Sequence, residues 1–98
     1  MSNNVEAAIN WGNGKVYFFS GSQYIRYDIP SGQQDQPAGS ISSGWPTLSF
    51  TDGIDGIVNW GNGKAYFFSG SQYVEYDMYN DKQIGNPKSV AQDFGLKF

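Results

Sequence analysis

The chain has 98 residues, of which 17% are aromatic and 15% are charged, and its net charge is −3. This length supplies at most one small domain, and so aromatic a composition argues against a disordered protein. Because no cluster of Lys or Arg accompanies the acidic balance, the sequence predicts no nucleic-acid partner.

Two reactive residue types are missing. The chain has no cysteine and no histidine, which excludes disulfides, thiolate chemistry, the most common general base and haem ligation through histidine. No Ser-His-Asp group, phosphate loop or metalloprotease motif is present, so we expect no enzyme activity. No apolar run reaches the roughly 18 residues of a membrane span and no signal-peptide pattern is visible, so we also expect no membrane partner.

The first half of the chain predicts a three-stranded antiparallel meander. A strand near residues 5–11 is followed by Asn13-Gly14, a pair that accepts positive φ and therefore favours a type I′ hairpin turn. The second strand covers residues 15–20, and a turn centred on Gly21 leads into a third strand over residues 23–28.

The second strand is apolar on both faces. Residues 16–19 read Val-Tyr-Phe-Phe, whereas a half-solvated strand alternates apolar and polar side chains. Both faces of the sheet must therefore be covered. The small pair Ala7-Ala8 in the first strand suits a crowded position such as the axis of a ring of sheets.

A polar stretch and a helical signal follow the third strand. Residues 37–44 carry a weak signal, because they include glycine and three serines. The signal is clearer near the C-terminus, where Asn86 is the N-cap candidate, Pro87 the first helical residue and Gly95 the terminator.

The sequence contains an internal repeat. Residues 9–28 return as residues 58–77, an offset of 49 (58 − 9), with about 16 of the 20 positions identical, and a period of this length is typical of propellers and solenoids. Among the differences, Arg26 becomes Glu75, which places this position in solvent or at a contact that differs between the halves.

The order of the motifs points to a family. Each half reads Trp-x-x-x-Lys-x-Tyr-Phe-Phe, from Trp11 and Trp60, and then x-Gly-x-x-Tyr-x-x-Tyr-Asp, ending at Asp28 and Asp77. This pattern resembles the hemopexin repeat, and the resemblance covers essentially the whole chain. We expect the two terminal aspartates to cap turns rather than to form a catalytic carboxylate pair.

The resemblance implies an all-β fold of hemopexin-like β-propeller blades: two four-stranded antiparallel blades per chain, each with a short outer helix. Residues 1–98 then form a single half-propeller, with blade one at 3–50 and blade two at 52–98. Family domains close four blades into a ring, whereas two blades leave two aromatic faces open. We expect a homodimer with two-fold symmetry to complete the propeller. The alternative is an excised half of a longer chain.

The resemblance also implies an ion site in the central channel. Calcium, sodium or chloride occupies this channel in the family, held by main-chain groups of the innermost strands. One layer maps to Glu6 and Asp55, and a second layer maps to Ala8 and Ile57. Backbone carbonyls suit hard cations, so the change from Glu to Asp is tolerated. The alternative is a channel filled by water alone.

The implied function is a non-enzymatic binding or scaffold module, secreted or extracellular, for an unknown protein or small-molecule ligand. Two alternatives stay open. One is a carbohydrate-binding, lectin-like propeller with aromatic stacking surfaces, although we expect most aromatic residues in the blade core. The other is an engineered or ancestral-like structural assembly without a ligand.

Overall fold

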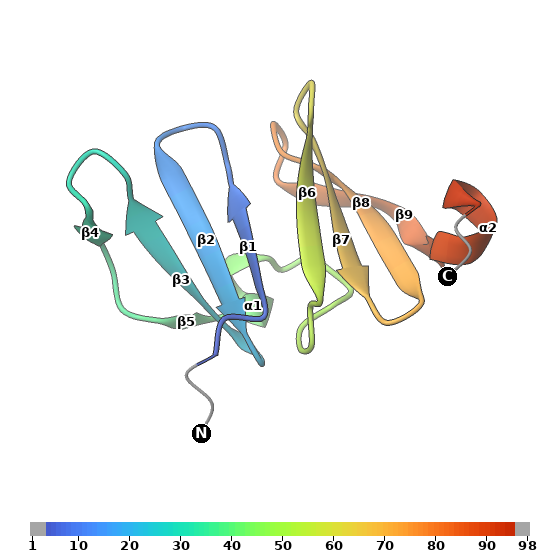
Figure 1. Ribbon diagram of the computed structural model, residues 1–98, viewed down its shortest axis with the longest axis horizontal. Helices are drawn as coiled ribbons and strands as arrows, with labels where there is room; N and C mark the ends of the chain where they lie inside the picture. Colours follow the sequence, from blue (N-terminus) through green and yellow to red (C-terminus); the bar gives the residue numbers. More distant parts are fainter. Residues whose placement is uncertain (1–3, 96–98) are drawn as a thin grey trace.

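The computed structural model describes residues 4–95. The elements, in chain order, are β1 (Ala7–Asn10), β2 (Lys15–Ser20), β3 (Gln23–Asp28), β4 (Gln33–Gln34), β5 (Gly39–Ser40), α1 (Ile41–Gly44), β6 (Gly56–Gly61), β7 (Lys64–Ser69), β8 (Gln72–Asp77), β9 (Lys82–Ser89) and α2 (Val90–Phe94). They form two antiparallel sheets side by side (Figure 1). Within residues 4–95, no helix is long and apolar enough to cross a membrane.

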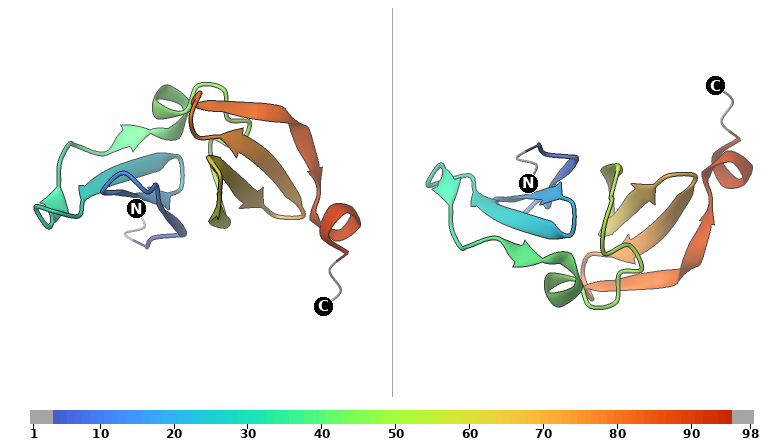
Figure 2. Two further views of the ribbon diagram at one scale, coloured as in Figure 1. Left: turned by 90° about the horizontal axis from the view of Figure 1, so that it is seen from above. Right: turned by 90° about the horizontal axis from the view of Figure 1, so that it is seen from below.

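Each sheet is a meander that runs from an inner strand outward (Figure 2). The predicted second and third strands are confirmed with the same bounds, as β2 and β3, and the repeat reproduces them as β7 and β8. The second sheet has four strands, in the order β6-β7-β8-β9. The mostly β architecture with short helices therefore agrees with the expected blades.

The outer strand of the first sheet differs from the expected single fourth strand. It is divided into β4 and β5, which both pair with β3. Pro37 lies in the gap and has no N–H to donate to the ladder, while Asp35 turns its carboxylate back onto Lys15 and Arg26 of the neighbouring strands. The first sheet consequently has five strands instead of four.

The same sequence, Asn-Trp-Gly-Asn-Gly-Lys, forms two different turns in the two sheets. In the second sheet Asn62 and Gly63 have φ of 56° and 75°, the pair of positive values that a type I′ turn requires. In the first sheet Asn13 does not have a positive φ. The type I′ prediction is therefore wrong at Asn13-Gly14, although the hairpin itself forms.

Contacts with the neighbouring sheet accompany this difference. Within the first hairpin the Asn13 Oδ1 accepts a hydrogen bond from the Lys15 N–H at 3.2 Å, and from the second sheet the Asn59 Nδ2 donates to the Asn10 carbonyl at 3.0 Å. The first hairpin thus lies against the second sheet, whereas residues 4–95 form no third sheet beside the second hairpin. An isolated sequence motif cannot contain this information.

The C-terminal helix begins later than the sequence predicts. Its N-cap is Ser89, whose Oγ accepts a hydrogen bond from the Gln92 N–H at 3.2 Å, and not Asn86. Pro87 instead lies within β9, an outer strand, where a missing N–H is tolerated. The predicted terminator is confirmed, because Gly95 has a left-handed φ of 63°.

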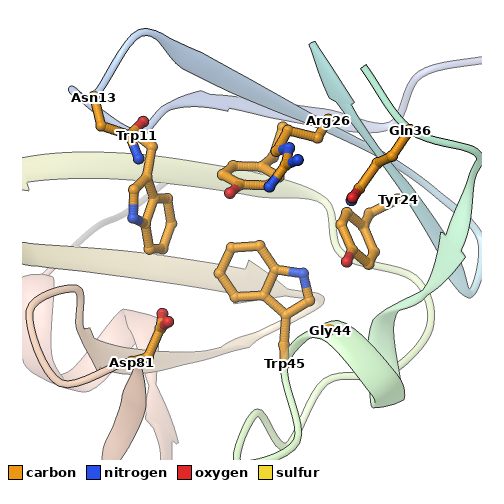
Figure 3. A pocket seen from close by; sticks show the side chains of 9 residues that line it. Trp11, Asn13, Tyr24, Arg26, Gln36, Gly44, Trp45 and Asp81 are labelled. Carbon is orange, nitrogen blue, oxygen red and sulfur yellow. The ribbon is translucent and has the colours of Figure 1, made fainter. Parts of the chain in front are cut away.

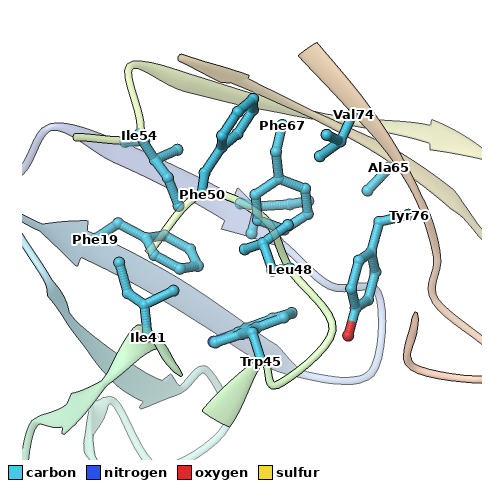
Figure 4. Close-up of a cluster of buried hydrophobic side chains, with 12 residues drawn as sticks. Phe19, Ile41, Trp45, Leu48, Phe50, Ile54, Ala65, Phe67, Val74 and Tyr76 are labelled. Atoms are coloured by element: carbon cyan, nitrogen blue, oxygen red, sulfur yellow. The ribbon is translucent and has the colours of Figure 1, made fainter. Parts of the chain in front are cut away.

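The hydrophobic core lies between the two sheets (Figure 4). Three groups of buried side chains meet there, from one face of the first sheet, from the facing surface of the second sheet and from the segment that connects them. These groups are Ala7, Ile9 and Phe19; Ala65, Phe67, Val74 and Tyr76; and Ile41, Trp45, Leu48, Phe50 and Ile54. The connecting segment therefore forms part of the hydrophobic core between the two sheets.

Trp45 is the centre of this junction. It is 4% exposed, and the rings of six other described residues have centroids 4.9 to 6.0 Å from its own ring. Most of these rings meet it edge to face, the arrangement that aromatic quadrupoles prefer. One side chain thus joins both sheets.

Candidate functional site

The inner strands β1 and β6 lie next to each other where the two sheets meet (Figure 1). Each pairs with one neighbour only, so alternate backbone groups point to its open edge. The Asn10 carbonyl lies on this edge, since it accepts its hydrogen bond from Asn59. Ala8, two residues earlier, shares the edge, and Ile57 holds the equivalent place in β6, opposite Phe67.

Glu6 and Asp55 occupy equivalent places before these strands. The Glu6 Oε1 accepts a hydrogen bond from the Gly21 N–H at 2.9 Å, and the Asp55 Oδ2 accepts one from the Gly70 N–H at 2.6 Å. Both carboxylates are therefore occupied in capping the turn between the second and third strands of their own sheet. In each residue one carboxylate oxygen is committed to this turn.

The donor set fits the ions that the resemblance implies. Free carbonyl oxygens are ligands for hard cations such as calcium and sodium, and free N–H groups suit chloride. Among the described residues, no three His, Cys, Asp or Glu side chains gather in positions to hold a metal ion.

Each sheet has one covered face and one open face. Ile9 in the first sheet is 4% exposed, whereas its counterpart Val58 in the second is 43% exposed. Conversely, Ala65 in the second sheet is fully buried, whereas its counterpart Val16 is only half-buried. Identical or similar residues thus pack against a neighbour at the central junction and lack one at the two outer faces.

A groove of about 510 Å³ runs along one rim, between the two sheets. It is bounded by the β1–β2 hairpin, the β6–β7 hairpin and the β8–β9 turn, which lie at the same end of the sheets (Figure 1). The described residues that line it are Trp11, Gly12, Asn13, Asn59, Gly61, Asn62, Gly63, Met78 and Tyr79. We call it the rim groove.

A smaller cavity of about 170 Å³ shares Trp11 and Asn13 with the rim groove (Figure 3). Aromatic rings enclose it, with Arg26 and Gln36 on one side and Asp81 on the opposite side. The Trp45 Nε1 is buried and has no hydrogen-bond partner within residues 4–95. The cavity therefore adjoins the aromatic junction, but its accessible lining is mostly polar.

An ion-pair network borders this cavity. Asp35 accepts hydrogen bonds from the Lys15 Nζ at 2.7 Å and from the Arg26 Nε at 2.9 Å, which lowers the pKa of Asp35 and raises that of both cations. In the second sheet Glu75 instead faces Lys64 at 3.3 Å. Arg26 and its counterpart Glu75 therefore have different charge partners. This agrees with one of the two interpretations of the sequence, a contact that differs between the halves.

The sequence family is now clear. The hemopexin family model matches residues 5–49 and 54–97, which is most of the chain. This chain belongs to the hemopexin family, and its two matches correspond to the two sheets. A search of curated proteins finds no match.

Solved structures agree with this assignment. A 2S albumin seed protein from Dolichos is 27% identical with a TM-score of 0.81, and a plant albumin from Cicer arietinum that shows hemagglutination is 26% identical with a TM-score of 0.82; both cover 92% of this chain and 44% of their own. The hemopexin-fold protein CP4 from cow pea is 29% identical, covers 90% and 43%, and has a TM-score of 0.79. The chain spans less than half the length of these proteins.

Sequence reasoning missed the rim groove. Its exposed aromatic residue, Tyr79, lies two residues after the repeated block, where the first half has Pro30. The change from Pro30 in the first half to an aromatic residue at the equivalent position of the second half was the available sequence signal for this groove. The spacing of the other aromatic residues, which belong to the core, concealed it.

Proposed function

We propose that this chain is a non-enzymatic recognition module and that two copies together close one four-bladed propeller. The observation that carries the proposal is the pair of open faces. The second sheet exposes Val58 and Trp60, the latter to 58%, and the first sheet leaves Phe18 and Tyr27 half-buried.

The repeat itself supplies the docking geometry. Inside the chain, the face with Ile9 and Phe19 packs against the face with Phe67 and Tyr76. The open faces carry the counterparts of these same residues, so a second copy can form the same junction again. Two such junctions related by a two-fold axis close the ring and leave no open face.

The relatives support four blades in the ring. The Dolichos and Cicer proteins match over less than half of their length, which leaves room in each for an equal second portion. Two further blades on a longer chain would cover the same faces. The mass of the 98-residue chain in solution separates these two arrangements.

A charge on the open face tests the proposal. Trp60→Asp places a carboxylate in the expected contact between copies, so light scattering should show a dimer for the unchanged chain and a monomer for the variant. Tyr79→Ala is the matched control, because it removes an exposed aromatic residue that lies outside both faces. A dimer that survives Trp60→Asp would contradict this interface.

We further propose that calcium, sodium or chloride binds on the ring axis through main-chain groups of Glu6, Ala8, Asp55 and Ile57. The open edges of β1 and β6 support this, because two copies would aim four such edges at one channel. A bound ion stabilises the ring and must raise its melting temperature. The monomeric Trp60→Asp variant should lose this rise, and no rise with any of the three ions would contradict the site.

A second candidate function is carbohydrate recognition. The hemagglutination of the Cicer albumin favours it, and so does the exposed aromatic residue beside the rim groove. The family resemblance favours a secreted or extracellular protein for either function. A glycan array without hits would remove this second candidate and would leave the dimer proposal untouched.

A further inference from the structure

We infer that the rim groove binds a neutral carbohydrate and that Tyr79 is the surface on which the sugar ring stacks. This inference rests on the second candidate function and assigns it a location.

Tyr79 is the most exposed large aromatic residue in the described part of the chain, at 80%. Burying an aromatic ring is favourable, so an exposed ring beside a groove offers a surface that another molecule can cover. The ring lies directly over Gly63, where any Cβ would collide with it. Since Gly63 also has a positive φ of 75°, a glycine there serves the turn and the ring together.

The backbone beneath Tyr79 is held rigidly. The Asp77 Oδ1 accepts hydrogen bonds from the N–H groups of Tyr79 at 3.0 Å and Asn80 at 3.2 Å, and the Met78 N–H donates to the Gly63 carbonyl at 2.8 Å. The Asn80 Nδ2 adds a hydrogen bond to the Asp77 Oδ2 at 2.7 Å. The main chain of the turn that carries the exposed ring is thus held by hydrogen bonds, so stacking a ligand does not require this part of the backbone to become ordered.

The rest of the groove is uncharged and rich in amides. Of the described residues that line it, none carries a charge at neutral pH, and three are asparagines. Asn59 is committed to Asn10 and Gly61, whereas the Asn62 side chain has no hydrogen-bond partner within residues 4–95. An amide both donates and accepts, which matches the hydroxyl groups of a sugar.

These features select one class of ligand. A sugar ring offers an apolar C–H face to an aromatic ring and hydroxyl groups to amides around its rim. A nucleotide or an acidic glycan would require a cation, which the lining lacks. A volume of about 510 Å³ lies within the range of small-ligand sites and admits a short oligosaccharide.

The groove belongs to one chain. All of its lining residues come from the same copy, so binding does not require the dimer. In the equivalent groove between two copies, Pro30 would replace Tyr79 and no stacking surface would be present. The closed dimeric ring therefore carries two stacking sites, one on each chain, so one dimer can cross-link two glycans.

The test is a glycan array of neutral and sialylated oligosaccharides, probed with the unchanged chain and three variants. We expect binding to neutral glycans and a loss of at least roughly tenfold in affinity for Tyr79→Ala. Asn62→Gly, which keeps the positive φ and removes the amide, should also weaken binding. Pro30→Ala, the matched change in the other repeat, should bind as the unchanged chain does.

Circular dichroism checks that each variant folds. Unchanged binding by Tyr79→Ala would place the sugar elsewhere and overturn the inference while keeping the carbohydrate function. Binding to sialylated glycans alone would overturn the inference but keep the carbohydrate function, and binding to no glycan would overturn the inference and the second candidate together. Trp60→Asp should still bind a single glycan but no longer agglutinate, which separates failure of the groove from failure of the dimer.

Discussion

Trp11 packs edge-on against Trp45, with ring centroids 4.9 Å apart and an angle of 70° between the ring planes. The pair joins the first hairpin to the segment that connects the two sheets. In the second repeat the counterparts are Trp60, which packs against Tyr66 and is 58% exposed, and Phe94. The second repeat therefore has the parts of the same junction without a sheet to cover them.

Trp45→Ala should destabilise the chain by roughly 3–5 kcal/mol, because it leaves a cavity among six aromatic rings. Urea unfolding followed by circular dichroism measures this. Trp45→Phe should cost less, since Phe stands at the equivalent position of the second repeat and the buried Nε1 has no hydrogen bond to lose within the described residues. A loss below about 1 kcal/mol for Trp45→Ala would contradict its place at the centre of the junction.

Asp28 should make stability fall at acidic pH. Hydrogen bonds from Ser31 and Lys15 lower the pKa of this carboxyl from 3.8 to about 2. A lowered folded-state pKa contributes stability that is present above pH 3.8 and is lost as pH falls towards 2. The melting temperature of Asp28→Asn should lie below that of the unchanged chain at neutral pH, and the gap should narrow near pH 2.

The control for this prediction is Asp52→Asn. Asp52 is exposed and has no hydrogen bond or ion pair within residues 4–95. We expect no difference in melting temperature at either pH. A gap for Asp28→Asn that stays constant from neutral to acidic pH would show that the hydrogen bonds seen here do not act through the ionised carboxylate.

The Tyr73 phenol should ionise at a higher pH than an ordinary tyrosine. Its hydroxyl donates to the Asp93 Oδ2 at 2.7 Å, and this contact, with burial, raises the pKa of the phenol to about 12. Because the folded state holds the proton more tightly, the stability contributed is complete below about pH 10 and declines as pH rises towards 12. Ultraviolet titration of Asp93→Asn should show one phenol shifted to lower pH, and superimposable curves would contradict the contact.

The strands were predictable because their signals are local. Residues 15–20 and 23–28 carry apolar side chains on both faces between turn residues, and their repeat confirmed the unit. The helix start at Ser89 was not predictable, because Asn86-Pro87 is an equally good N-terminal signal in isolation. The helix starts after Ser89 because β9, which includes Asn86 and Pro87, pairs with β8 up to that residue. This pairing is a tertiary interaction that the local sequence does not show.

The candidate sites were likewise predictable only in part from the sequence. The family pattern locates Glu6 and Asp55 at the inner strands, but only the structure shows that their carboxylates cap the turns at Gly21 and Gly70. The rim groove was not predictable, because it forms where two hairpins and the turn at Tyr79 meet. Identical Asn-Gly sequences also adopt different turns, and only the first of these turns lies beside the other sheet in the described residues.

The most direct measurement of the central claim is the mass of the unchanged chain in solution by light scattering. We expect a particle of twice 10.8 kDa at micromolar concentration, since each open face can pack against the complementary face of a second copy. A particle of 10.8 kDa that remains folded would show that two blades suffice on their own, and would contradict the claim.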